Sequence, residues 1–207
     1  MDAGELLCAQ RVVPVVVIDD AEQAVPLAEA LHAAGLGAVE ITLRTNAALD
    51  AIARVARAMP DMLTGAGSIR SVAQLRQASN AGAHFCVSPG STAPLLAAAA
   101  DGGIPLVPGA ATATEVMRLL DAGYRLQKFF PASLSGGVSA LRALGAPLPE
   151  ARFFPTGGIA RASAADYLAL SNVLCIGGTW IAPRELLAAG DFDEIRCRAA
   201  DAAALLL

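Results

Sequence analysis

The sequence predicts an α/β protein, a single-domain (β/α)8 TIM barrel that spans residues 1–207. Short apolar runs recur at regular intervals, and alanine-rich segments with helical spacing separate them. Strands that alternate with helices are typical of βαβ units and of a parallel sheet. No G-x-G-x-x-G motif follows the first run, as a doubly wound dinucleotide-binding sheet would have, and a chain of 207 residues is long enough for one barrel domain.

Eight apolar runs are the expected strands of this barrel, and a short helix is expected before the first of them. The runs cover residues 12–18, 37–43, 61–67, 83–89, 103–109, 124–130, 152–158 and 172–178. Barrel enzymes carry their chemistry at the carboxyl ends of the strands, with contributions from several strands at once. The residues that end these runs are therefore the candidates for a functional site.

The segments between the runs have the spacing of amphipathic helices. The stretches AEQAVPLAEALHAAG at 21–35 and LDAIARVARAM at 49–59 are two examples. Ser71 precedes VAQLRQASNAG, and Thr112 precedes ATEVMRLLDAG. Because Ser and Thr are favoured N-caps and Gly commonly follows a helix, each of these segments is expected to form a helix.

Composition argues against several other classes of protein. Hydrophobic residues make up 55% of the chain and the net charge is −4 with scattered basic residues, so no nucleic-acid partner is expected. The acidic start MDAGELLCAQ does not resemble a signal peptide, and no apolar run is long enough for a membrane span. The four cysteines are widely separated and the two histidines are isolated. We therefore expect a cytoplasmic protein with free thiols, no metal site, no cofactor and no membrane partner.

Lys128 is the only lysine in a chain that otherwise uses arginine for its positive charge, and it precedes two phenylalanines in YRLQKFF. Arginine stays protonated and is a poor nucleophile, whereas the pKa of a lysine removed from water falls toward neutrality. A neutral amine can attack a ketone and form a Schiff base. The alternative interpretation is an ordinary surface lysine.

Glu40 stands in the second run, AVEITLRT, where a barrel strand usually has Val or Ile. Side chains alternate along a strand, so Glu40, Thr42 and Arg44 share one face. If that face points inward, a carboxylate lies inside the barrel and an arginine lies at its rim. A buried charge needs a partner, and Glu40 could form either a structural ion pair with Lys128 or the acid–base half of a Schiff-base site.

Other candidates lie at the ends of later runs. Ser68 follows TGAG at the third strand and offers a hydroxyl, while Pro89 ends the fourth and either walls a pocket or makes a turn. Paired glycines end the seventh and eighth runs, in PTGGIA and CIGGTW. Backbone N–H groups ahead of helix starts bind anions, and barrels commonly bind phosphate after strands seven and eight. We therefore predict a phosphate site there.

The motifs VVPVVV, VEITLRT, GAGS, SPG, KFFPAS, FFPTGGI and LCIGGTW occur in this order from about Arg11 to the C-terminus. Together they resemble the bacterial 2-keto-3-deoxy-6-phosphogluconate (KDPG) and 4-hydroxy-2-oxoglutarate (KHG) aldolase family. The resemblance implies a class I, metal-independent aldolase with a (β/α)8 barrel, typically a homotrimer. Such an enzyme splits a phosphorylated keto acid into pyruvate and glyceraldehyde 3-phosphate in the Entner–Doudoroff pathway.

The resemblance also implies a role for each matching residue. Lys128 would be the Schiff-base lysine and Glu40 the proton-transfer residue, with Arg44 and Ser68 on the keto-acid carboxylate. The pocket walls would be Pro89, Phe130 and Thr156, and the phosphate end would be Gly157, Gly158, Gly178 and Thr179.

This chain departs from the family pattern at three positions. The family usually has Thr at Ser68 and Ser at Thr179, so both hydroxyls are retained, whereas Ser133 replaces a usual Glu and changes the local charge. A sister family acts on the galactonate epimer and tends toward PLNS and VGG where this chain has TLRT and TGG. These differences favour the gluconate substrate.

Three alternatives remain at this stage. The same chemistry could act on the galactonate epimer or on unphosphorylated KHG. A phosphate-binding barrel isomerase could use Glu40 as a base and Lys128 as a charged electrophile without an imine. An inactive barrel could serve as a binding module, although the intact lysine, glutamate and arginine argue against it.

Overall fold

The computed structural model describes residues 3–206, in which parallel strands alternate with helices. In chain order the elements are α1 (Ala3–Leu7), β1 (Val12–Val16), η1 (Ala21–Gln23), α2 (Ala24–Ala33), β2 (Ala38–Thr42), α3 (Ala48–Ala58), β3 (Leu63–Gly67), α4 (Val72–Asn80), β4 (Phe85–Val87), α5 (Ala93–Gly102), β5 (Leu106–Val107), β6 (Gly109–Ala110), α6 (Ala113–Asp121), β7 (Leu126–Phe129), α7 (Gly137–Gly145), β8 (Arg152–Pro155), α8 (Arg161–Leu168), β9 (Ile176–Gly178), α9 (Arg184–Ala189), α10 (Phe192–Ala203) and η2 (Ala204–Leu206). Each of the predicted apolar runs contains a strand.

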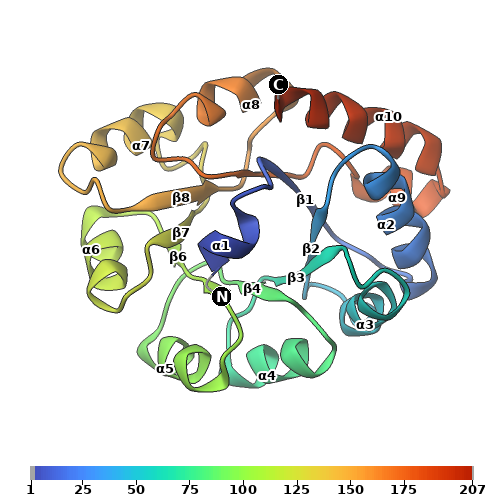
Figure 1. The fold of residues 1–207 in the computed structure, drawn as a ribbon, viewed down its shortest axis with the longest axis horizontal. Helices are drawn as coiled ribbons and strands as arrows, with labels where there is room; N and C mark the ends of the chain where they lie inside the picture. Colours follow the sequence, from blue (N-terminus) through green and yellow to red (C-terminus); the bar gives the residue numbers. More distant parts are fainter. Residues whose placement is uncertain (1–2, 207) are drawn as a thin grey trace.

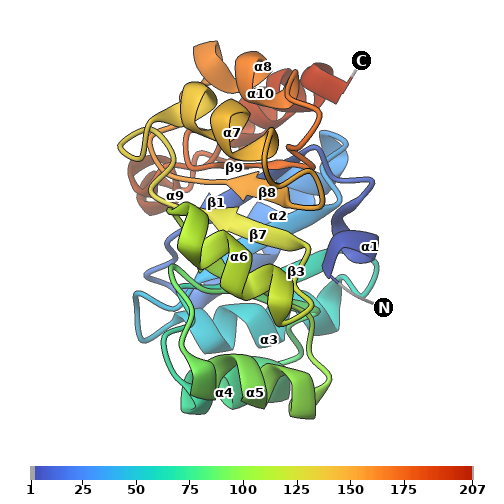
Figure 2. The ribbon, with the colours of Figure 1, turned by 90° about the vertical axis from the view of Figure 1, so that its left-hand side faces the viewer.

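The helices lie outside the strands. Figure 1 looks down the shortest axis and shows α2 to α10 around the strands, with the short helix α1 over the centre. Figure 2, turned by 90°, shows the strands running through the middle of the molecule with helices above and below them. This arrangement leaves each strand with one face toward the helices and one face toward the centre.

Every strand pairing in residues 3–206 is parallel, which confirms the predicted α/β class. The strands form a six-stranded sheet in the order β5-β4-β3-β2-β1-β9 and a three-stranded sheet in the order β6-β7-β8. The expected single closed sheet of eight strands is therefore seen only in part. Closure of the barrel stays a prediction.

The two sheets divide within the fifth apolar run. β5 pairs with β4 and β6 pairs with β7, and Pro108 lies between β5 and β6. Proline has no N–H group to donate to a neighbouring strand, although its carbonyl still accepts one. Here the carbonyl of Pro108 accepts the N–H of Lys128 at 2.8 Å. The chain thus passes from one sheet to the other at Pro108.

The other boundary between the sheets lies between β8 and β9. Isolated parallel bridges join Phe153 to Val173 and Thr156 to Gly177. The N–H of Leu174 donates to the carbonyl of Phe153 at 2.9 Å. Backbone hydrogen bonds therefore connect the segments on both sides of this boundary.

Two hydrophobic clusters follow from the alternation of side chains along the strands. On β2, Val39 and Ile41 belong to the larger cluster that also contains helix residues. On the opposite face, Ala38 belongs to a second cluster with Phe85 and Phe154, and Leu7 of α1 packs into it. Glu40 shares this inner face because it is two residues from Ala38, so the strand places its carboxylate toward the centre.

The two predicted helix starts are confirmed. The hydroxyl of Ser71 accepts the N–H of Gln74 at 3.2 Å at the start of α4. Thr112 and Glu115 form a reciprocal capping box at the start of α6. Within residues 3–206, no helix is long and apolar enough to cross a membrane, and no group of three potential metal ligands lies together.

Candidate active site

The buried amine of Lys128 lies next to the buried carboxylate of Glu40. The distance from Nζ of Lys128 to Oε1 of Glu40 is 3.2 Å, and their side chains are 3% and 0% exposed. Lys128 comes from β7 and Glu40 from β2, which belong to different sheets. The predicted contact between these two residues is thus present. The surface-lysine interpretation is wrong.

One oxygen of Glu40 remains available for chemistry. Oε2 is buried and has no hydrogen-bond partner among residues 3–206. A buried carboxylate oxygen without a donor is costly, because it has lost water without gaining a protein partner. Such an oxygen can accept a proton from a bound molecule while Oε1 faces the lysine. A purely structural ion pair would not explain the unpartnered oxygen.

Gly67 at the end of β3 makes room for the carboxylate. A Cβ on Gly67 would lie 2.1 Å from Oε1 of Glu40, closer than side-chain carbons approach an oxygen. Gly67 pairs with Thr42 in the sheet, so the glycine is directly beside the strand that carries Glu40. The hydroxyl of Thr42 donates to the carbonyl of Val16 at 2.9 Å, which ties β2 to β1. The glycine in GAGS therefore has a specific role in positioning Glu40.

The surroundings of the pair are apolar and poorly solvated. The Nζ atom of Lys128 lies 5.2 Å from the ring centroid of Phe130, a cation–π distance. Burial, and secondarily the negative charge of Glu40, raise the pKa of the Cys86 thiol to about 12.

Arg44 and Ser68 meet at the rim, as predicted. The Nε–H of Arg44 donates to the hydroxyl of Ser68 at 3.1 Å. Ser68 has a φ of 60°, in the left-handed region, and follows β3 directly. Both residues line a cavity of about 410 Å³ together with Leu43, Arg70, Pro89 and Phe130.

Pro89 and Phe130 thus form part of the same cavity wall. The segment that carries Pro89 packs closely on β6, because a Cβ on Gly109 would lie 2.3 Å from the carbonyl carbon of Pro89. Phe130 connects the cavity to the buried pair, since its ring contacts Lys128. Four predicted substrate-binding residues, Arg44, Ser68, Pro89 and Phe130, therefore surround one space next to the amine.

Thr156 lies deeper, outside the lining of that cavity. It is buried, and its Oγ1 has no hydrogen-bond partner among residues 3–206. A Cβ on Gly177 would lie 2.3 Å from this oxygen, so a glycine is needed opposite Thr156. The unpartnered hydroxyl is available to a bound molecule.

Three of the four predicted phosphate-binding residues, Gly157, Gly158 and Thr179, follow β8 and β9, and the fourth, Gly178, is the last residue of β9. Gly157 and Gly158 have φ values of 101° and 72°, a conformation that glycine adopts without strain. The bridge between Thr156 and Gly177 brings the two loops together, which places Gly178 and exposed Thr179 near the first glycine pair. The adjacency that the paired glycines predicted is present. Anion binding there stays a prediction.

Ser133 lies against this glycine pair. A Cβ on Gly158 would lie 1.9 Å from Oγ of Ser133, so the hydroxyl is close to the Gly158 backbone. The N–H of Ser133 also donates to the carbonyl of Gly157 at 3.0 Å. The usual acid of the family is therefore replaced by a neutral hydroxyl directly at the predicted phosphate end.

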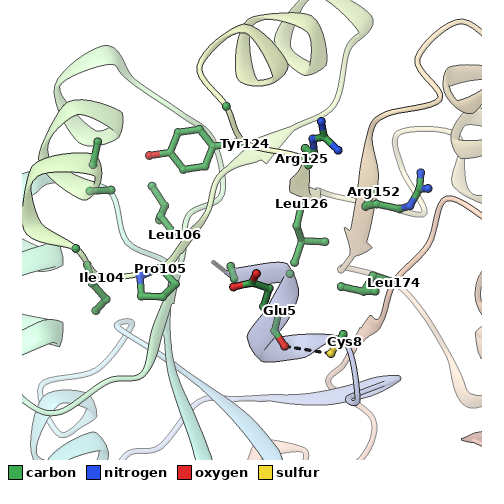
Figure 3. Close-up of a pocket in the computed structure, with 16 residues that line it drawn as sticks. Glu5, Cys8, Ile104, Pro105, Leu106, Tyr124, Arg125, Leu126, Arg152 and Leu174 are labelled. Atoms are coloured by element: carbon green, nitrogen blue, oxygen red, sulfur yellow. Dashed lines mark hydrogen bonds between the residues drawn. The ribbon is translucent and has the colours of Figure 1, made fainter. Parts of the chain in front are cut away.

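Another cavity, of about 580 Å³, lies at the opposite ends of the strands. Its lining includes Glu5 and Cys8 of the N-terminal segment, and Leu106 and Leu126, which begin β5 and β7 (Figure 3). None of the predicted site residues lines it. The smaller cavity is the candidate site, because Phe130 in its wall lies next to the amine of Lys128.

Arg70 is a cavity residue that the sequence analysis missed. It lines the cavity beside Arg44 and Ser68. It follows Ser68 by two positions in a loop, where no strand or helix periodicity indicates the direction of a side chain. The only sequence signal was its closeness to the GAGS motif.

Parallel strands that bring a buried lysine next to a carboxylate define a class of enzyme, one that can form a Schiff base with a carbonyl substrate. A lysine, an acid–base carboxylate and a cationic rim together fit a carbon–carbon lyase that acts on keto acids.

A family model described as KDPG and KHG aldolase matches residues 4–197. The chain belongs to this family. It is 48% identical over 98% of its length to the 2-dehydro-3-deoxy-phosphogluconate aldolase of Dickeya dadantii, of which it covers 95%. It is 49% identical over 93% of its length to the KHG/KDPG aldolase of Escherichia coli K12, of which it covers 91%.

Solved structures give the same result. The structure is similar to that of the KDPG aldolase from Legionella pneumophila with pyruvate captured as a covalent carbinolamine intermediate. The TM-score is 0.94 with 41% identity, and the match covers 97% of both chains. The family predicted from the sequence motifs is confirmed.

Proposed function

We propose that this protein is a class I aldolase that cleaves 2-keto-3-deoxy-6-phosphogluconate to pyruvate and glyceraldehyde 3-phosphate. The observation that carries the proposal is the 3.2 Å contact between Nζ of Lys128 and Oε1 of Glu40 in a buried, apolar setting. The names of the Dickeya and Escherichia relatives support the substrate, and the carbinolamine of the Legionella enzyme supports the covalent chemistry.

The reaction begins with imine formation at Lys128. The neutral amine attacks the C2 ketone of the substrate and gives a carbinolamine. Glu40, in its protonated form, gives a proton to the departing hydroxyl, so that water leaves and an iminium forms. Because Nζ of Lys128 lies 3.2 Å from Oε1 of Glu40, a carbinolamine formed on Nζ holds its hydroxyl close to the acid.

Carbon–carbon cleavage then uses the unpartnered side of the same carboxylate. Glu40 accepts the proton of the C4 hydroxyl, the C3–C4 bond breaks, and its electron pair moves toward the iminium to form an enamine. Glyceraldehyde 3-phosphate is released. Protonation of the enamine at C3 and hydrolysis of the resulting iminium release pyruvate and regenerate Lys128. General acid–base assistance of this kind contributes about 10²–10⁴ in rate.

Binding of the two ends of the substrate fixes C4 relative to Glu40. Arg44 and Ser68 hold the carboxylate next to the ketone, and the planar guanidinium suits this group because it can donate two parallel hydrogen bonds. Pro89, Phe130 and Thr156 enclose the carbon chain. At the far end, the backbone of Gly157, Gly158 and Gly178 and the hydroxyl of Thr179 hold the phosphate.

The proposed reaction is independent of metal ions. The cationic iminium is the electron sink for bond cleavage, a task that a metal performs in other aldolases. We expect turnover to be unchanged by chelators and by added divalent cations. A rate that depends on a divalent cation would contradict this part of the proposal.

We also propose that the two sheets are parts of one closed (β/α)8 barrel in a single domain. The fifth apolar run contributes a strand to each sheet, and backbone hydrogen bonds link β8 to the β9 segment. Assembly as a homotrimer and a place in the Entner–Doudoroff pathway remain proposals that rest on family membership.

A second candidate substrate is 4-hydroxy-2-oxoglutarate, because the Escherichia relative is named for both KHG and KDPG. Steady-state cleavage of KDPG, its galactonate epimer and KHG, measured by pyruvate release, separates the candidates. We expect the highest kcat/KM for KDPG, since only this substrate has both the phosphate and the gluconate stereochemistry. A kcat/KM for KHG equal to that for KDPG would contradict the proposed role of the glycine loops in phosphate binding.

A further inference from the structure

Two arginines line the cavity next to the buried amine. Arg44 and Arg70 are both part of its wall, together with Ser68 and Phe130. The same two arginines also line an adjoining cavity of about 380 Å³ that contains Thr45 and Asn46. Both arginines therefore line both of these neighbouring cavities.

No carboxylate balances this pair of positive charges. Neither cavity has an Asp or Glu in its lining. Within residues 3–206, neither Arg44 nor Arg70 takes part in an ion pair, although five other arginines do. Like charges around one cavity repel each other, and an anion in the cavity relieves that repulsion.

The backbone of Arg70 is held in place. The N–H of the preceding residue, buried Ile69, donates to the carbonyl of Val87 at 3.0 Å. The N–H of Arg70 itself donates to Oε1 of Gln74 at 2.8 Å, and Ser71 then caps α4. The loop thus presents Arg70 from a fixed point two residues after Ser68.

We propose that Arg70 is a further substrate-binding residue, which donates to the keto-acid carboxylate together with Arg44 and Ser68. This inference rests on the proposed function, because it assigns a role within that binding site. A second cation at this end makes the site selective for 2-oxo acids over neutral ketones. The effect falls on substrate affinity, since the carboxylate keeps its charge throughout the reaction.

The test uses Arg70→Gln and Arg70→Lys, with Arg76→Gln as the matched control. Arg76 is an exposed arginine on α4 that lines a different cavity, so its loss changes the net charge equally. Pyruvate binding is measured by calorimetry. In parallel, the pyruvate concentration that gives half-maximal borohydride trapping is measured. The half-maximal concentration is then measured for methyl pyruvate, a neutral ester with the same ketone. Thermal unfolding confirms that each variant is folded.

We expect Arg70→Gln to weaken pyruvate binding about tenfold, because one charge-assisted hydrogen bond from an exposed arginine is lost. Arg70→Lys should give a smaller loss, because the charge remains without the planar fork. Methyl pyruvate should be trapped equally well by all variants, and Arg76→Gln should resemble the wild type. High salt should reduce the difference in pyruvate affinity between the wild type and Arg70→Gln.

The inference is overturned if Arg70→Gln binds pyruvate as tightly as Arg76→Gln does. It is also overturned if Arg70→Gln raises the half-maximal trapping concentrations of pyruvate and of methyl pyruvate by the same factor. A wild-type protein that binds pyruvate in the calorimeter but is not trapped by borohydride would contradict the imine instead. The calorimetric comparison of the variants would then still decide the role of Arg70. A wild-type protein that binds no pyruvate would contradict both proposals.

Discussion

Gly67 and Glu40 fit together so closely that any side chain at position 67 would displace the carboxylate. A Cβ at Gly67 would lie 2.1 Å from Oε1, which is the oxygen that contacts Lys128. The glycine therefore sets the distance between the acid and the amine. This relationship connects a backbone feature of β3 to the chemistry of residues on β2 and β7.

We expect Gly67→Ala to lower kcat by about 10²-fold, because a small displacement of an acid–base group is costly to catalysis. The measurement is steady-state KDPG cleavage. Gly102→Ala is the control, since Gly102 ends α5 and has no atom within 4 Å of the added methyl group. Full activity in Gly67→Ala would mean that Glu40 can move without loss.

Replacement of Glu40 by Gln removes the proton acceptor and keeps the shape. Because Gln cannot accept a proton at working pH, we expect kcat to fall by about 10²–10⁴-fold. Pyruvate binding should change much less, because Arg44 and Ser68 hold the carboxylate. The two quantities are measured by turnover and by calorimetry. Equal losses in both would assign Glu40 to binding rather than to proton transfer.

The cysteines should divide into two groups in alkylation experiments. Burial raises the pKa of Cys86 to about 12 and also raises that of Cys175, whereas Cys8 and Cys197 are exposed. Because the thiolate is the reactive form, iodoacetamide at pH 8 should modify only the exposed pair in the folded protein. Mass spectrometry reads the sites, and the denatured protein provides the control with all thiols modified. Rapid modification of Cys86 in the folded protein would contradict its burial beside the active site.

The capping box of α6 gives a pH-dependent contribution to stability. The backbone N–H of Ala111, followed by the hydroxyl and N–H of Thr112, lowers the pKa of Glu115 from its usual 4.5. The contribution is therefore complete above that usual pKa and is lost as the pH falls through the lower, folded-state pKa.

We expect Glu115→Gln to lower the free energy of unfolding by about 0.5–1 kcal/mol at pH 7. The difference from wild type should shrink as the pH falls from the usual pKa of 4.5 through the folded-state pKa, and should stay small below it. Urea unfolding at several pH values measures it, with Glu150→Gln, an exposed carboxylate before β8, as the control. A difference that stays constant with pH would show that the charge of Glu115 is not involved.

The sequence predicted the parallel fold and the central pair because both depend on local rules. Alternation along a strand places Glu40 on the inner face of β2, and the common direction of parallel strands brings it near Lys128 of β7. The motif order was specific enough to indicate the family. Arg44 and Ser68, which follow the neighbouring strands β2 and β3, meet at the rim for the same reason.

Other features depend on tertiary contacts that a single sequence does not specify. The fifth run divides at Pro108, because the neighbours of β5 and β6 belong to different sheets. The role of Gly67, which accommodates the carboxylate of Glu40, follows from the packing of β3 against β2 and not from the motif alone. Arg70 was not predicted, because the direction of a side chain in a loop depends on its tertiary contacts and not on periodicity.

The central claim is that Lys128 forms an imine with the substrate. Incubation with pyruvate and sodium borohydride, followed by peptide mass spectrometry, tests it most directly, because the chain has one lysine. The account predicts one reduced pyruvate adduct on Lys128, and it predicts that a folded Lys128→Arg variant, which keeps the charge but not the nucleophile, has neither adduct nor turnover. An unmodified Lys128 in an enzyme that still cleaves KDPG, or substantial turnover by Lys128→Arg, would contradict it.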